Sequence, residues 1–103
     1  MKIISDIVKD MIEEVCDAKR RIERAMEFKP LYPSIARREG EIAEQELVHA
    51  EKDHKSVTEL IEDFKKDKGD PPEYMMEFWK EKHEKFMEKY AHVKYMIEMF
   101  NKS

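Results

Sequence analysis

Apolar side chains recur at spacings of three and four along most of the chain, which is the period of an α-helix that buries one face. The first such stretch predicts a helix over residues 3–29. Its apolar stripe consists of Ile4, Val8, Met11, Val15, Ala18, Ile22 and Ala25. The segment KPLYPS at 29–34 then ends the helix, because proline lacks an amide donor and restricts the residue before it.

A second apolar stripe predicts a helix over residues 34–67, about 50 Å long at about 1.5 Å per residue. This stripe consists of Ile35, Ile42, Ala43, Ala50, Val57, Ile61 and Phe64. Gly40 lies inside the helix, where a glycine costs up to about 1 kcal/mol relative to alanine. A glycine kept in such a place can mark a close contact with another helix.

The segment KKDKGDPPE at 65–73 ends the second helix and begins a third over residues 72–101. Gly69 suits a C-terminal cap. Asp70, a proline in the first turn and Glu73 are typical of a helix start. The third stripe consists of Met75, Phe78, Trp79, Phe86, Tyr90, Val93, Ile97 and Phe100.

The sequence therefore predicts an all-α fold with three long antiparallel helices in a single domain, residues 1–103. A chain of 103 residues is long enough for one small core and too short for two. A helix of about 50 Å is long for such a domain. We expect a helical bundle that is complete within the chain or is completed by a partner.

Composition and charge narrow the possible partners and compartment. Charged residues make up 43% of the chain, apolar residues 41%, and the net charge is only -4, with both signs interspersed. Such faces are typical of solvated helices, not of a nucleic-acid binder, which would carry a basic stripe. No apolar run reaches the length of a membrane span, and no secretory signal is recognisable. The single cysteine, Cys16, favours a reducing, cytoplasmic setting.

Three acidic residues of the second predicted helix lie within its apolar stripe. Glu39, Glu46 and Asp53 are spaced seven apart, so they nearly superpose on one helix face. Burying an unpaired carboxylate is costly. A cation, a bound proton, water or exposure at the edge of a bundle must therefore compensate their charge.

Glu46 also begins a Glu-x-x-His pair with His49, which projects from nearly the same face one turn later. That spacing can offer an oxygen and a nitrogen to one metal ion, although it is common by chance in a chain rich in glutamate. Folding the first helix back at residues 30–33 puts residue 14 at about the depth of residue 47. Glu14 is then the candidate third ligand, with an ordinary surface glutamate as the alternative.

The surrounding residues, IARREGEIAEQELVHAEKDH, resemble the second helix of rubrerythrin-type ferritin-like proteins, which typically reads I-A-x-x-F-x-x-x-A-x-Q-E-x-x-H-A. The matching residues are Ile35, Ala36, Ala43, Gln45, Glu46, His49 and Ala50. The resemblance covers roughly 20 residues and implies a ferritin-like bundle with a bound metal, iron or manganese first and zinc as another divalent ion. It implies Glu14, Glu46 and His49 as the ligands in this chain.

The chain departs from the ferritin-like pattern because it has no second Glu-x-x-His pair, and because Glu39 replaces an aromatic residue. One chain thus provides half of the ligands that the family uses. A two-fold homodimer would supply the other half, and encapsulated ferritins resemble this arrangement. Glu88 and His92, four apart on the third helix, are expected to be a solvated pair.

Two functions stay open at this point. The first is a ferritin-like metal-binding protein with ferroxidase-type oxidation of Fe(II). The second is a metal-free helical interaction or assembly protein, phage-related, that keeps the ferritin-like scaffold. The sequence does not decide whether the chain is an enzyme. No nucleophile motif and no phosphate-binding loop is recognisable in it. The absence of a CxxC pair removes the rubredoxin-like electron donor of rubrerythrins.

Overall fold

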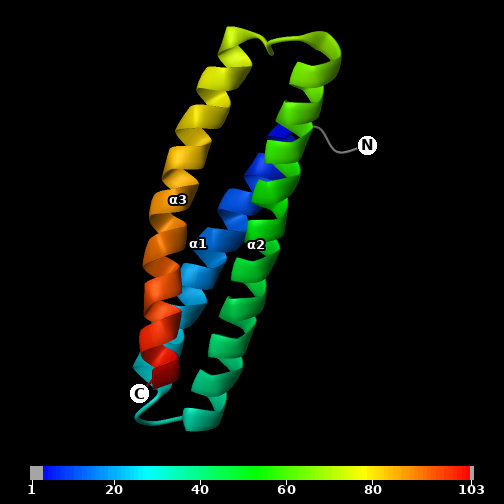
Figure 1. The fold of residues 1–103 in the computed structure, drawn as a ribbon. Helices are drawn as coiled ribbons and strands as arrows, with labels where there is room; N and C mark the ends of the chain where they lie inside the picture. Colours follow the sequence, from blue (N-terminus) through cyan, green and yellow to red (C-terminus); the bar gives the residue numbers. More distant parts are fainter. Residues whose placement is uncertain (1–3, 103) are drawn as a thin grey trace.

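The computed structural model describes residues 4–102 as three α-helices joined by two short connections (Figure 1). They are α1 (Ile4–Phe28), α2 (Pro33–Lys68) and α3 (Glu73–Lys102). No strand occurs in this part of the chain, so the all-α prediction with three helices is confirmed. Each predicted boundary lies within one residue of the observed one, except that residue 3 falls outside the described residues.

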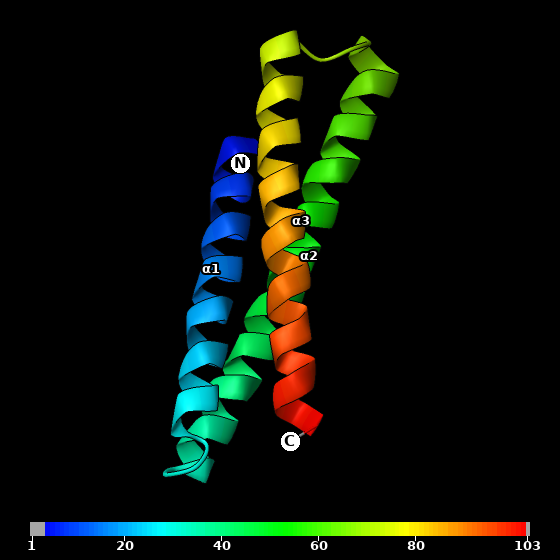
Figure 2. The ribbon, with the colours of Figure 1, turned by 90° about the vertical axis from the view of Figure 1, so that its left-hand side faces the viewer.

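The chain reverses direction at each connection, as Figures 1 and 2 both show. The molecule is elongated, with extents of 55 × 23 × 18 Å, and its length is that of α2. α1 packs most extensively against α2, less against α3, and the α2–α3 contact is the sparsest. None of the helices between residues 4 and 102 combines the length and apolarity that a membrane span requires.

The stripe predicted for the first helix forms the centre of the core. Its fully buried members are Val8, Met11, Val15, Ala18, Ile22 and Ala25. They pack against buried residues of both other helices in one cluster that includes Phe86, Val93 and Ile97 of α3. Burying each of the larger side chains contributes about 1.5–3 kcal/mol, so this stripe holds the three helices together.

The buried face of α2 begins one residue later than the sequence predicts. Ile35 is 48% exposed, whereas Ala36 is buried. The buried face consists of Ala36, Gly40, Ala43, Leu47, Ala50, Val57 and Ile61. The prediction of Ile35 as a core residue was wrong because it favoured a large side chain over Ala36 and Gly40, the small residues that α2 buries here.

Gly40 allows a close helix contact, as its position in the second helix predicts. A Cβ atom at this position would lie 2.6 Å from Cε1 of Phe100 on α3. At the other end of α2, Gly69 adopts φ +83° and its N–H bonds to the carbonyl of Lys65 at 3.2 Å. A left-handed glycine ends the helix there, and three lysines in the last turn suit its negative end.

Candidate metal centre

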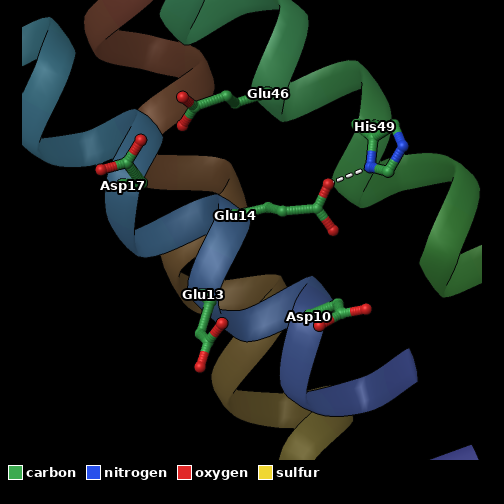
Figure 3. Close-up of a pocket in the computed structure, with 6 residues that line it drawn as sticks. All are labelled: Asp10, Glu13, Glu14, Asp17, Glu46 and His49. Atoms are coloured by element: carbon green, nitrogen blue, oxygen red, sulfur yellow. Dashed lines mark hydrogen bonds and ion pairs between the residues drawn. The ribbon is translucent and has the colours of Figure 1, made fainter. Parts of the chain in front are cut away.

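Three potential ligands converge between α1 and α2. Glu14 extends from α1, and His49 and Asp53 lie one turn apart on α2. One ligand atom of each lies within 4.8 Å of the others. His49 Nδ1 and Glu14 Oε2 share a hydrogen bond, drawn as a dashed line in Figure 3. The same nitrogen lies 3.8 Å from Asp53 Oδ2.

The carboxyl group of Glu14 is in a poor environment for a negative charge. Its side chain is only 20% exposed, and Oε1 has no hydrogen-bond partner among the described residues. Burial, and then the hydrogen bond with Asp53, raise the pKa of Glu14 to about 7, although His49 acts in the opposite direction. A cation at this point would remove the repulsion between the two carboxyl groups and satisfy the unpaired oxygen.

Glu46 lines the same surface groove as Glu14 and His49, but it contacts a different set of groups. Arg21 Nε lies 2.9 Å from Glu46 Oε1 and 3.0 Å from Asp17 Oδ2. The Arg21 guanidinium also reaches Glu39 Oε2 at 3.1 Å. Burial, and then the neighbouring Asp17, raise the pKa of Glu46 to about 7, while Arg21 acts to lower it. Arg21 is thus a cation shared by Glu39 and Glu46, and Arg24 lies 3.8 Å from the other oxygen of Glu39.

Within one chain, Glu14 and His49 therefore meet each other, while Glu46 points away from His49 toward the side of Asp17 (Figure 3). There it accepts a hydrogen bond from Arg21. Helical side chains lean toward the N-terminus of their helix, so partners in antiparallel helices are displaced in opposite directions. Glu14 leans toward the depth of Asp53, and Glu46 leans toward the depth of Asp17. The sequence prediction compared only the depths of the Cα atoms. It therefore paired Glu14 with Glu46, because it ignored this lean of the side chains.

Two residues of the candidate site are not predicted from the sequence, Asp53 and Arg21. Asp53 belongs to the line of acidic residues, but the ferritin-like pattern assigns it no role. Arg21 could have been predicted by folding the first helix back on the second. The fold that places residue 14 level with residue 47 also places residue 21 level with residue 40, next to Glu39. A basic residue at that depth, on the flank of the first apolar stripe, indicates a cation near the acidic residues of the second helix.

The groove around these residues is strongly acidic. Its volume is about 360 Å³, and it is lined by Asp10, Glu13, Glu14, Asp17, Glu46 and His49. The His49 side chain is 67% exposed, so an ion can enter from solvent. Glu13 points away from His49 in Figure 3, as expected from its place on the helix.

The three converging residues fit a divalent metal ion. Two carboxylates and one imidazole are a donor set that suits iron, manganese or zinc, whereas magnesium and calcium prefer oxygen alone. The buried unpaired oxygen of Glu14 supports a cation at this point. Glu46 is not among the converging atoms. Its Oε1 accepts from Arg21, while its Oε2, like Oε1 of Glu14, is buried without a partner among the described residues.

Two other histidines form a separate pair between α2 and α3. His54 Nε2 lies 2.8 Å from His83 Nδ1, and Trp79 and Phe86 surround the rings. Burial, and then His83, lower the pKa of His54. Glu88 and His92 are both exposed, as the sequence predicts.

Comparison with protein-family models, with curated proteins and with solved structures finds no match. The resemblance to ferritin-like proteins thus depends on the residues of the second helix quoted above.

Proposed function

We propose that the protein binds a divalent first-row transition-metal ion through Glu14, His49 and Asp53. The observation that carries this proposal is the meeting of Glu14 from α1 with two potential ligands of α2, all within 4.8 Å. The unpaired buried oxygen of Glu14 supports it independently, since an ion would satisfy that atom. The donor set favours iron or manganese, with zinc as the next candidate.

We further propose that two copies pair across this groove in a ferritin-like arrangement. Three protein ligands leave coordination positions open, and a two-fold copy would bring a second Glu14, His49 and Asp53 to the same face. Glu46 would join the ligand set through Oε2, the oxygen that Arg21 does not bond. Such a paired site would suit oxidation of Fe(II), its substrate, by O2 as the electron acceptor, which is the activity that the ferritin-like resemblance implies.

Metal binding by purified variants tests the site. We expect the wild type to retain Fe(II) or Mn(II) in anaerobic equilibrium dialysis, and His49→Gln and Asp53→Asn to lose most of it. Glu13→Gln and His92→Gln are matched controls, because neither residue belongs to the cluster of Glu14, His49 and Asp53. Equal metal content in the wild type, His49→Gln and Asp53→Asn would falsify the proposal.

Glu46→Gln distinguishes a metal site within one chain from a site that two copies share. If the ion is held within one chain, this variant keeps its metal. If two copies form a shared site with Glu46 as a ligand, it loses metal together with His49→Gln.

A second function, a metal-free interaction or assembly protein, is favoured by a different observation. Leu31, Tyr32 and Ile35 are 74%, 55% and 48% exposed at the connection between α1 and α2. Neighbouring exposed apolar side chains often mark a protein contact. Admission of air to an anaerobic Fe(II) solution discriminates: a ferroxidase develops oxo-iron absorbance faster than buffer, and an assembly protein does not.

A further inference from the structure

The contact between His54 of α2 and His83 of α3 brings two imidazole nitrogens face to face. The distance between Nε2 of His54 and Nδ1 of His83 is 2.8 Å, and the ring centroids are 4.9 Å apart with planes at 26°. One ring donates its N–H and the other accepts with its lone pair. Both side chains are partly buried, so the pair is held in place by its surroundings.

We propose that His54 and His83 form a second metal site, which takes one Cu(II) or Zn(II) ion between their facing nitrogens and links α2 to α3. Imidazole is a ligand that suits these ions. The site is distinct from the Glu14 cluster, which joins α1 to α2. Although His54 follows Asp53 in the chain, successive side chains point about 100° apart around a helix.

The observed separation fits a single ion. Metal–nitrogen bonds of about 2.0 Å at a right angle put the two nitrogens about 2.8 Å apart, and a tetrahedral angle puts them about 3.3 Å apart. The backbone therefore needs little or no movement. The rings must rotate so that their lone pairs converge, and the shared hydrogen moves to the outer nitrogen of the donating ring, so no proton is lost.

The surroundings support such a link. Trp79 lies 5.4 Å from both imidazole rings, and Phe86 lies 5.0 Å from that of His54. These aromatic walls limit access of water to the pair. Because the α2–α3 contact is the sparsest in the molecule, an ion bound here would stabilise the weakest helix pair.

Trp79 is the only tryptophan of the chain and provides the measurement. Bound Cu(II) quenches the fluorescence of a nearby indole, so Cu(II) is titrated into the purified protein while this fluorescence is followed. The test variants are His54→Gln and His83→Asn, whose amides stand in for the interacting nitrogens. The control is His92→Gln on the exposed face of α3. His49→Gln is measured separately, to show whether the copper that quenches Trp79 is at the other cluster.

We expect saturable quenching with the same midpoint in the wild type and in His92→Gln, and quenching that persists in His49→Gln. In His54→Gln and His83→Asn, the midpoint should move to a Cu(II) concentration about tenfold higher or more, since even the loss of an outer-shell partner costs that much. Unchanged midpoints in both test variants overturn the proposal. A midpoint that shifts only in His49→Gln also overturns it, because the copper is then at the Glu14 cluster.

Circular dichroism shows whether the variants keep their helices. If either test variant loses helix content, the electron paramagnetic resonance spectrum of the wild-type Cu(II) complex decides. Coupling to two nitrogens supports the His54–His83 site, and coupling to one nitrogen contradicts it.

Discussion

Glu14 and Glu46 are carboxyl groups whose surroundings favour the protonated form. The pKa of each is raised to about 7, chiefly by burial. Because the folded state binds these protons more tightly than the unfolded state, their contribution to stability is fully present below the unfolded pKa of about 4.5. It is lost as the pH rises through about 7, so metal-free protein is penalised at alkaline pH.

Replacing Glu14 by glutamine should remove part of this penalty. We expect metal-free Glu14→Gln to be more stable than the wild type at pH 8 by roughly 1–3 kcal/mol, with a smaller difference at pH 5. Denaturant unfolding at both values measures it, with Glu13→Gln as the control. The lowered pKa of His54 changes stability with pH in the opposite direction. Because His54 is present in both proteins, its effect cancels in the difference between Glu14→Gln and the wild type. A difference that does not change with pH would contradict the raised pKa.

Arg21 offsets the negative charge of the acidic residues in the other half of the groove. Its guanidinium contacts Asp17, Glu39 and Glu46, and the side chain is 31% exposed. Arg21→Met leaves these carboxylates without their common cation, and we expect unfolding free energy to fall by roughly 1–3 kcal/mol at pH 8. The loss should shrink at pH 5, where Glu46 takes up a proton.

Arg20→Met is the matched control for Arg21. Arg20 is 74% exposed and, among residues 4–102, pairs with Asp17 alone, so its loss should change stability little. Equal effects of the two substitutions would show that Arg21 has no special role in neutralising the groove.

At the scale of the helices, the small residues of α2 decide how closely its neighbours pack. Gly40 and Phe100 occupy one contact between α2 and α3. Gly40→Ala gains helix propensity of about 1 kcal/mol but places a methyl group against the ring. The two effects are separated by a double-mutant cycle with Phe100→Leu.

We expect Gly40→Ala to be more favourable in the Phe100→Leu protein than in the wild type by roughly 1 kcal/mol. Thermal or denaturant unfolding of the four proteins measures this coupling. Additive effects would mean that the ring moves aside without cost.

The helices themselves could be predicted closely from the sequence because their signals are local. Apolar periodicity, two proline-containing breaks and Gly69 determine where each helix begins and ends. The site was harder to predict because it depends on how two helices are placed side by side. The sequence brought Glu14 and His49 into one candidate site, whereas the partners of Glu46 follow from the lean of side chains in antiparallel helices.

At the scale of the whole molecule, α1 and α2 carry an acidic groove that is open to solvent at His49. Pairing of two copies across this groove would double the ligand set and bury Val48, which is 48% exposed beside it. Repulsion between the two acidic faces opposes pairing unless cations are bound. Assembly and metal binding are therefore expected to be coupled.

Sedimentation with and without Mn(II) tests this coupling. We expect added Mn(II) to increase the fraction of dimer, and Val48→Glu to decrease it. Leu60→Glu is the matched control, because Leu60 is similarly exposed, at 43%, on another face of α2. An oligomeric state that ignores both Mn(II) and Val48→Glu would contradict pairing through the groove, without affecting the single-chain site.

The position of the metal ion is tested most directly by anomalous diffraction from crystals grown with Mn(II). We predict an anomalous peak bonded to Glu14, His49 and Asp53, with oxygen and nitrogen distances of about 2.0–2.3 Å. A second peak related by a two-fold axis would add the paired arrangement. Diffraction that shows no peak at these residues, while His49 and Glu14 remain hydrogen-bonded to each other, would contradict the metal site.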